Sequence, residues 1–408
     1  MFYFLSVIAL VITISAQDHK PILKWYRSAS EPERESSSFH QAKFFFFYTS
    51  PAQSYVTHEE VCNYLHEYAN QFGLYKYISY GCEVTQLTVR KGSDSTSMKG
   101  NSSSNSIHDA WPKITLQWKK SGTNEQYFEE TFDAVCVCNG HYATPSSPTI
   151  SGQEFFRGTT MHSIEYDNPA DFTDLTVLCV GARASGSDLA REISASAKRV
   201  YLSDPDIPRH EYCTCPRVLG SVTLVPRTIS VDSESTVYFE GGFKTSPGEV
   251  DVIIFCSGYD YRFPFINSSS NLELICIPGE RRVSPLVEQL WHAASPSITF
   301  VGLQHSVVPF PFFEFQAQAV VAQLCKTAPI AFPLYKERLE MSYRDAISGG
   351  PVKPGRVQST HFLGSHQWDY CRKMARMAGN INKETEDFII TNKVSSLANF
   401  CLFLLPLE

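Results

Sequence analysis

The sequence has little positive charge and no long apolar runs, and both features exclude some classes of function. It holds 35 Lys and Arg against 42 Asp and Glu, a formal net charge of −7, so it offers no basic field for nucleic acid. Its apolar N-terminal run, residues 2–14, has about the length of a signal-peptide core and is too short for a membrane-spanning helix. We therefore expect no nucleic-acid partner.

Several sequence patterns that mark catalytic or metal sites are also missing. There is no G-x-S-x-G nucleophile elbow, no Walker A motif and no pair of Cys or His clusters at zinc spacing. Of the 12 cysteines, Cys136, Cys138, Cys179 and Cys256 lie inside apolar runs, where cysteine behaves as a small buried hydrophobe. Cys213-x-Cys215 has no partner pair. The sequence predicts reduced thiols and no metal site.

The apolar N-terminal run leaves two locations open. Ser15-Ala16 follow it as small residues, but no Lys or Arg precedes it. As a signal peptide it would direct the chain to the endoplasmic reticulum or secretory pathway, where Asn101 and Asn267 would be glycosylation acceptors; as part of the fold it leaves the chain cytoplasmic. The short apolar run 400–408 is expected to dock on the fold. Membrane association and oligomeric state stay open.

The length of 408 residues favours two domains. Thr57 and Glu60 form a capping box that opens a helix, whose apolar face is Val61, Leu65, Tyr68 and Phe72. The alternating runs 83–89, 114–118 and 127–132 predict a β-meander, with a polar loop at 93–107.

Two later segments share one pattern of an acidic residue, an apolar run, Cys, any residue and Gly. They are residues 133–141, which contain Asn139 and Gly140, and residues 251–259, which contain Gly258. Meander-like runs at 221–225 and 236–239 precede the second copy. Although a plain buried strand and turn explains one copy, the repeat is typical of two nested dinucleotide-binding domains.

The segment from Val177 to Ala190 predicts the turn that binds a dinucleotide. Four apolar residues run into Gly181-x-x-x-Ser185-Gly186, and Leu189, Ile193 and Ala197 follow at helical spacing. A buried strand, a tight turn and a helix N-terminus in this order bind pyrophosphate through backbone N–H groups. Arg183 stands where the middle glycine of G-x-G-x-x-G belongs, so an ordinary turn without a ligand is the alternative.

The pattern just before this turn resembles a known family. Phe156-x-Gly158-x-x-x-His162-x-x-x-Tyr166 is similar to the identifying sequence of flavin-containing monooxygenases. Cys138-Asn139-Gly140-His141 and the segments 255–265, 301–303, 309–316 and 361–370 resemble further landmarks, in the same order. The resemblance is strongest to the S-oxygenating branch known from plants, and it covers about residues 55–379.

The resemblance implies an α/β fold of two nested, three-layer, Rossmann-like dinucleotide-binding domains with β-meander insertions, the first one incomplete. The expected parts are an apolar N-terminus or signal peptide (1–17), a partial FAD-binding domain (18–155), an inserted NADP-binding domain (156–250), the remainder of the FAD-binding domain (251–380) and a C-terminal tail (381–408).

In that family NADPH reduces FAD, and the reduced flavin activates dioxygen for transfer to an amine nitrogen or a sulfide sulfur, so no catalytic side chain is assigned. The motif residues Phe156, Gly158, His162 and Tyr166 would shape the linker between domains. The resemblance assigns cofactor binding to Gly181, Arg183, Ser185, Gly186, Asp188, Ser203, Asn139, Gly140, Gly258, Glu314 and Gln316.

Structural roles stand beside these assignments. His162 is equally expected as a hydrogen-bonded core histidine, and Glu314 and Gln316 as residues that cap or face a helix. Phe310, Phe312 and Phe313 suit a core better than a substrate pocket. Arg183 has the widest range of possible roles, from a ligand of the 2′-phosphate to a side chain that fills an empty nucleotide site.

Two features depart from the family. No G-x-G-x-x-G occurs in the sequence, so the FAD half is expected to be incomplete, and a non-enzymatic, nucleotide-binding paralogue is the rival to a monooxygenase. A disulfide reductase would need a redox cysteine pair beside the flavin, which is not found. Secondly, Asp204 follows Ser203 at the position where the family usually has Arg, and an Asp suits a ribose 2′-hydroxyl rather than a 2′-phosphate. Arg183 or Arg209 could restore the positive charge. The resemblance to the family favours NADPH over NADH.

Overall fold

The computed structural model describes residues 12–14, 58–90, 111–120, 126–207, 217–276, 281–347 and 360–404. They form two compact units: the first combines Tyr3–His141 with Tyr261–Pro406, and the second is Tyr142–Asp260. Asn101, Arg209 and the Cys213-x-Cys215 pair lie outside the described residues.

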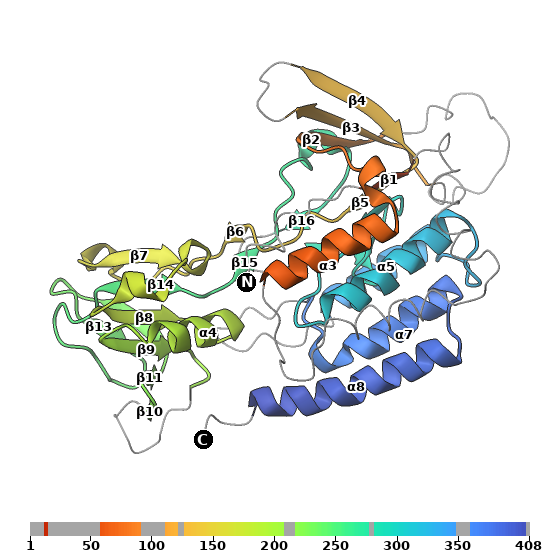
Figure 1. Ribbon diagram of the computed structural model, residues 1–408. Coiled ribbons are helices and arrows are strands. Elements are labelled where there is room, and N and C mark those ends of the chain that lie inside the picture. The colour runs from red at the N-terminus through yellow and green to blue at the C-terminus, as the bar shows by residue number, and fades with distance from the viewer. Residues whose placement is uncertain are drawn as a thin grey trace. The chain divides into compact units, whose positions relative to one another are not determined.

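The second unit is built on a six-stranded sheet in the order β10-β11-β9-β8-β14-β7 (Figure 1). All its neighbouring strands are parallel except the β10–β11 pair. Buried Val, Ile and Leu fill the central strands, as a sheet covered on both faces requires. The strands are β7 (Thr159–His162), β8 (Thr176–Val180), β9 (Arg199–Ser203), β10 (Arg217–Leu219), β11 (Val222–Val225) and β14 (Val252–Phe255).

One helix and one β-ribbon cover the two faces of this sheet. Helix α4 (Ala184–Ile193) buries Leu189, Ala190 and Ile193 in a cluster with Val177 and Cys179. The opposite face packs against the antiparallel ribbon of β12 (Thr228–Val231) and β13 (Val237–Phe239). The three layers and the parallel sheet confirm an α/β dinucleotide-binding architecture.

Two expectations differ here from the structure. Residues 222–225 do not belong to a meander, because β11 pairs in parallel with β9 at Val222↔Val200. Strand β14, expected in the remainder of the FAD-binding domain, lies between β8 and β7 in the second unit. Both depend on pairing between distant segments, which local periodicity does not determine.

The first unit has a five-stranded sheet in the order β1-β5-β20-β19-β18, in which β5 and β20 are parallel. Alternate residues of β5 enter two cores: Val135 and Val137 face one, and Cys136 faces the other. The strands are β1 (Ile12–Ile14), β5 (Ala134–Val137), β18 (Leu286–Val287), β19 (Trp291–His292) and β20 (Ile298–Phe300). Part of the N-terminal run is thus a strand, paired antiparallel with β5.

The predicted meander and the predicted first helix are both confirmed. Strands β2 (Cys82–Val89), β3 (Ile114–Lys120) and β4 (Tyr127–Phe132) form a three-stranded antiparallel sheet. Helix α3 (His58–Gln71) carries Tyr64, whose ring centroid lies 5.1 Å from that of Phe310. Leu87, Ile114 and Leu116 of the meander are buried in the first core.

Helices pack on the other face of the sheet, where α5, α7 and α8 lie side by side (Figure 1). They are α5 (Pro309–Leu324), α6 (Tyr335–Ile347), α7 (Gln367–Ala378) and α8 (Lys383–Leu404). Pro309 stands at the first position of α5, and Gly379, with φ 77°, ends α7. The segment expected as a tail is therefore largely helical, and Arg372 joins α7 to Glu386 of α8 at 2.8 Å.

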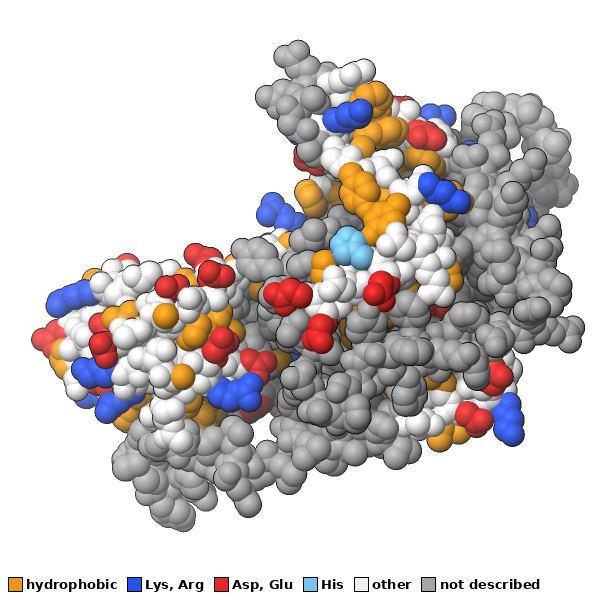
Figure 2. Space-filling model, in the orientation of Figure 1, with side chains coloured by type: hydrophobic (Ala, Val, Ile, Leu, Met, Phe, Trp, Pro, Cys, Tyr) orange, Lys and Arg blue, Asp and Glu red, His pale blue; other side chains and the backbone are white. Residues whose placement is uncertain are grey.

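Short elements complete the chain. Strands β6 (Thr144–Pro145) and β15 (Tyr259–Asp260) pair in the second unit, and β16 (Ile275–Cys276) pairs with β17 (Val283–Ser284) in the first. The 3₁₀ turns are Leu74–Tyr77, Gln153–Phe155, Ser163–Glu165, Pro169–Phe172, Ser268–Ser270 and Gly364–His366. Figure 2 shows acidic and basic side chains interspersed over the described residues of one face. Among the described residues, no helix has both the length and the apolarity to cross a bilayer.

Candidate functional site

The glycine turn after β8 depends on backbone contacts that only glycine allows. Gly181 has φ 106°, and a Cβ at this position would lie 2.8 Å from the carbonyl oxygen of Cys256. Its N–H donates to the carbonyl oxygen of Ser203 at 2.8 Å, which joins the turn to the end of β9. Glycine is therefore required both by the left-handed conformation and by the close approach of the neighbouring strand.

Gly186 brings helix α4 directly onto this turn. A Cβ at Gly186 would lie 1.7 Å from the carbonyl oxygen of Gly181, so no larger residue fits without movement of the backbone. The last glycine of a dinucleotide-binding fingerprint has the same role, because it lets the helix pack closely against the strand. Arg183, in place of the middle glycine, has φ −77° and ψ −172°, an extended conformation open to any residue.

The N-terminus of α4 presents backbone N–H groups without a capping side chain. Arg183 is the N-cap residue, its side chain is exposed, and it forms no side-chain cap hydrogen bond. The Ser187 hydroxyl donates to the carbonyl oxygen of Ala182 at 2.9 Å and so stabilises the turn. A helix start of this kind attracts phosphate through its N–H groups and its dipole. Ser185 lies half-buried in this first turn.

Asp204, rather than Ser203, faces the turn. Its Oδ2 accepts the N–H of Ala182 at 2.9 Å, and its Oδ1 accepts the N–H of Asp206 at 2.8 Å. Ser203 is 2% exposed; its hydroxyl donates to the carbonyl oxygen of Pro226 at 2.8 Å and accepts the N–H of Thr228 at 2.9 Å. The structure thus places Ser203 in the interior and Asp204 beside Gly181. Asp188 points away into solvent, 3.5 Å from Arg191.

The motif that precedes the turn organises the interior of the second unit. Gly158 is required because a Cβ there would lie 2.1 Å from the carbonyl oxygen of Asp251. The ring of Tyr166 stacks on Phe172 with centroids 5.8 Å apart, and Phe156 packs on the face of the sheet that carries the ribbon. These contacts support the structural role of the motif.

His162 holds the glycine that follows β14. It is 4% exposed; its Nδ1 accepts the N–H of Ile164 at 3.2 Å, so Nε2 carries the proton and donates to the carbonyl oxygen of Gly258 at 3.0 Å. Burial lowers the pKa of His162 and keeps the ring neutral. His162 is therefore a hydrogen-bonded core histidine, and Gly258 has the left-handed φ of 84° that this turn requires.

In the first unit, glycines follow the two parallel strands. Gly140 after β5 has φ 69°, and Gly302 after β20 has φ 84°. The carboxyl ends of parallel strands are where open α/β sheets bind ligands. His141 donates from Nδ1 to the carbonyl oxygen of Gly302 at 3.1 Å and ties the two strand ends together, while Asn139 donates to the carbonyl oxygen of Arg262 at 3.3 Å.

Gln316 is the centre of a buried hydrogen-bond network at this edge. It is fully buried; its Oε1 accepts the N–H of Gly302 at 3.0 Å, and its Nε2 donates to Gln304 at 2.9 Å and to Tyr370 at 3.1 Å. Tyr370 in turn donates to the carbonyl oxygen of Glu288 at 2.8 Å. The Gln316 amide thus positions the edge through protein contacts. The Glu314 carboxylate accepts a hydrogen bond from the Gln318 side chain at 3.1 Å. Burial is the main cause of the raised pKa of Tyr64 and of Tyr68, and the charge of Glu314 raises both further.

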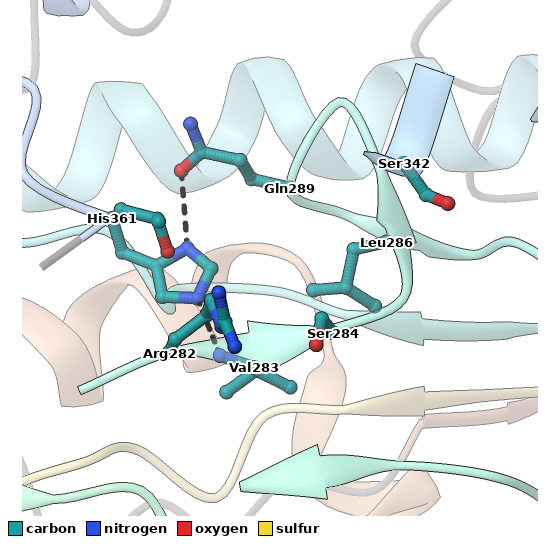
Figure 3. Close-up of a pocket in the computed structure, with 8 residues that line it drawn as sticks. Arg282, Val283, Ser284, Leu286, Gln289, Ser342 and His361 are labelled. Carbon is teal, nitrogen blue, oxygen red and sulfur yellow. Dashed lines mark hydrogen bonds between the residues drawn. The ribbon is translucent and has the colours of Figure 1, made fainter. Parts of the chain in front are cut away.

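The same network continues into the small pocket of Figure 3. His361 accepts the N–H of Val283 through Nε2 at 3.0 Å, and its Nδ1 lies 3.1 Å from Oε1 of Gln289 (Figure 3). Arg282, Ser284, Leu286, Ser342 and Thr360 complete the pocket lining. Gln289 and Glu288 both have left-handed φ, 52° and 51°, so side-chain contacts from distant segments hold a strained turn.

Replacement of Gln316 by leucine is expected to destabilise the first unit by about 2–4 kcal/mol, since it leaves the Gly302 N–H and the Gln304 side chain without this buried partner. All five tryptophans lie outside residues 142–260. Urea unfolding followed by tryptophan fluorescence therefore reports on this unit alone. Gln318→Leu, at a half-buried position of the same helix, is the matched control and is expected to cost under about 1 kcal/mol. Equal effects of the two changes would contradict the assigned role of Gln316.

The turn glycines could be predicted from the sequence, whereas these hydrogen-bond networks could not. Gln304 and Gln289 carried no recognisable pattern, and their partners lie 12 and 72 residues away. Among the described residues, no three His, Cys, Asp or Glu side chains form a group that could hold a metal. The nine described cysteines are free thiols; Cys136, Cys179 and Cys256 are buried as expected, whereas Cys138 at the end of its apolar run is only half-buried.

Comparison with known proteins shows what the chain is similar to. The model named flavin-binding monooxygenase-like matches residues 35–206. The chain is 29% identical over 340 residues to flavin-containing monooxygenase FMO GS-OX-like 4 of Arabidopsis thaliana, an alignment that covers 82% of this chain and 68% of that protein. The chain is therefore similar to flavin-containing monooxygenases.

Two further similar proteins show how much of the relatives' own length the chain matches. FMO GS-OX-like 8 of Arabidopsis thaliana is 31% identical over 317 residues, or 75% of this chain and 62% of the relative. The solved structure of S-allyl-L-cysteine S-oxygenase from Allium sativum matches with a TM-score of 0.66 and 27% identity, covering 85% of this chain and 74% of that one. The chain thus spans about two thirds of these flavin-containing monooxygenases, and it is similar to the S-oxygenating branch.

Flavin-containing monooxygenases use FAD and NADPH, and the two units fit these groups unequally. In the second unit, Gly181, Gly186 and the uncapped start of α4 form a cradle that a Cβ would fill, which suits a dinucleotide pyrophosphate. In the first unit, the described residues supply the strand edge at Gly140 and Gly302, but no glycine-rich turn that opens a helix lies among them. The pyridine-nucleotide half therefore fits, and the flavin half fits in part.

Proposed function

We propose that this protein is an NADPH-dependent flavin monooxygenase that adds one oxygen atom to the sulfur of a small thioether. The glycine turn of the second unit carries the proposal, because Gly181, Gly186 and the N-terminus of α4 leave room for a pyrophosphate in a chain that is similar to flavin-containing monooxygenases. The S-allyl-L-cysteine S-oxygenase of Allium sativum supports a thioether as the substrate class. An amine nitrogen is the second acceptor, as in N,N-dimethylaniline monooxygenase-type activity.

The proposed reaction converts a thioether, O₂, NADPH and H⁺ into a sulfoxide, water and NADP⁺. Bound FAD would supply the electron transfer and the activation of dioxygen. This chain's residues bind and orient the nucleotide: the α4 N–H groups receive the pyrophosphate, and Arg183 adds positive charge beside them. Ser187 keeps the turn closed, and His162 holds the Gly258 turn that follows β14.

The proposed activity is tested by loading the purified full chain with FAD, removing the excess by gel filtration and recording the visible spectrum. We expect a retained flavin band, loss of that band when NADPH is added without oxygen, and transfer of one ¹⁸O atom from ¹⁸O₂ to a thioether, detected by mass spectrometry. A colourless chain that still binds NADPH would instead indicate a nucleotide-binding protein without oxygenase activity. That outcome would agree with the missing G-x-G-x-x-G motif.

A further inference from the structure

Arg183 stands at a position of the cradle where the fold does not require glycine. Its backbone, with φ −77° and ψ −172°, is extended and open to any residue, whereas Gly181 and Gly186 are required by close backbone contacts. In a dinucleotide-binding fingerprint, the middle glycine lets the backbone approach the pyrophosphate. A side chain at this position keeps the pyrophosphate away from the backbone of the turn, so the turn has to hold it in another way.

The charges at the start of α4 favour an anion. The first N–H groups of a helix have no partner within the helix, and together with the helix dipole they give this end a partial positive charge. Arg183 adds a full positive charge at the N-cap, and no acidic residue lies in the first turn of α4. The Asp204 carboxylate contacts the backbone one residue earlier, at the Ala182 N–H. A cation at a helix N-terminus is unfavourable by itself, and a bound phosphate would remove this repulsion.

The backbone that carries the Arg183 side chain is fixed. The Arg183 carbonyl oxygen accepts the Ser187 N–H at 2.9 Å, and the Ser187 hydroxyl donates to the carbonyl oxygen of Ala182 at 2.9 Å. The Arg183 side chain itself is exposed and forms no cap hydrogen bond. Because a guanidinium group donates two parallel N–H bonds to phosphate oxygens, this side chain can supply the donors that the backbone supplies at a middle glycine.

The place of Arg183 in the fold favours one of the phosphates of a pyridine nucleotide. The pyrophosphate of a bound dinucleotide lies at the N-terminus of the helix, and Arg183 is the N-cap residue of that helix. The 2′-phosphate of NADPH is on the adenosine ribose, which lies near the residue about twenty positions after the first glycine. In this chain that position is at the end of β9. The pyrophosphate is the group that NADPH, NADH and ADP-ribose have in common.

We propose that Arg183 is a binding residue for the pyrophosphate, whose guanidinium takes over the contact that the backbone makes at the middle glycine of the fingerprint. The ligand class is therefore the adenosine 5′-diphosphate esters, and the contribution of Arg183 is the same with or without a 2′-phosphate or a nicotinamide. The inference rests on the proposed function only in its claim that the cradle binds a dinucleotide.

The test is isothermal titration of the full chain with NADPH, NADH and ADP-ribose, which reports binding without any turnover. In Arg183→Gln, we expect the dissociation constants of all three ligands to rise by the same factor, at least about tenfold, because a charged bidentate contact is lost. The melting temperature should stay near that of wild type, since the side chain is exposed.

The matched control is Arg191→Gln, which removes the same charge from the same helix. Arg191 lies in the last turn of α4 and pairs with Asp188 at 3.5 Å, so it is remote from the N-terminus. We expect each of the three dissociation constants to stay within about twofold of wild type.

Each result decides between the inference and the proposed function. If Arg183→Gln weakens NADPH but leaves NADH and ADP-ribose unchanged, Arg183 binds the 2′-phosphate; the inference is overturned and the proposed function stands. The inference is also overturned if all three constants stay at their wild-type values, or if Arg191→Gln weakens binding as much as Arg183→Gln. If none of the three ligands binds to the folded wild-type chain, the proposed function itself fails, and the inference fails with it.

Discussion

Replacing Gly186 by alanine is expected to weaken NADPH binding by about tenfold to a hundredfold and to destabilise the second unit by about 3 kcal/mol. The added Cβ would lie 1.7 Å from the Gly181 carbonyl oxygen and 3.2 Å from Cβ of Cys256. Because both neighbours belong to packed strand ends, helix α4 has to move outward. The N–H groups that receive the pyrophosphate then lose their positions. Calorimetric titration with NADPH and hydrogen exchange of residues 176–193 measure the two effects.

Asp188→Ala is the control on the same helix. Asp188 is exposed and its ion pair with Arg191 spans 3.5 Å at the surface, so its removal should change stability by less than about 0.5 kcal/mol. We expect NADPH affinity within about twofold of wild type. A Gly186→Ala chain that binds NADPH as tightly as the Asp188→Ala chain would show that the cradle does not hold the pyrophosphate.

The elements that could be predicted from sequence are those whose pattern is complete within a few residues. Helix α3, the meander β2–β4 and the β8–α4 pair each have local periodicity and a recognisable start or end in the sequence. Strand β11 shows the limit. Its apolar pattern suits either an antiparallel or a parallel neighbour, and only the distant pairing Val222↔Val200 determines which one forms.

In the candidate site too, features set by a few neighbouring residues could be predicted from the sequence, and contacts between distant residues could not. The turn glycines were predictable, because a left-handed φ or a close backbone contact excludes other residues at these positions. Ser203 and Asp204 were not distinguished, because consecutive residues at a strand end point to opposite faces, and the sequence does not show which one faces the turn. The Gln316 network joins Gly302, Gln304 and Tyr370, which are 12 to 54 residues away in sequence. Such pairs become neighbours only through the packing of the first unit.

Three buried histidines of the first unit are expected to make its stability fall steeply in mild acid. Burial lowers the pKa of His141 to about 4, of His292 to about 4 and of His361 to about 3; the nearby His305 and His141 also lower that of His361. Protonation would place a charge in the interior. It would also displace a backbone donor from two acceptor nitrogens, the Ser295 N–H at His292 and the Val283 N–H at His361.

The pKa values of these histidines are lower in the folded than in the unfolded chain, where histidine titrates near pH 6.5. The stability that comes from keeping these histidines neutral is therefore fully present above about pH 6.5. It is lost as the pH falls toward the pKa values of the folded state. Between about pH 6 and pH 5, each histidine is expected to lower the free energy of unfolding by about 1.4 kcal/mol per pH unit, or about 4 kcal/mol for the three. Urea unfolding at several pH values, followed by tryptophan fluorescence, measures this slope for the first unit alone, because the second unit contains no tryptophan.

A single variant isolates the histidine contribution from that of the carboxylates. In His361→Gln, the side-chain oxygen can accept the Val283 N–H but the side chain does not titrate, so the slope should fall by about 1.4 kcal/mol per pH unit. His66→Gln, at an exposed position of α3, is expected to leave the slope unchanged. If His361→Gln and wild type lose stability in parallel as the pH falls, protonation of His361 is not what destabilises the unit in acid. The loss would then have to come from titratable groups other than His361.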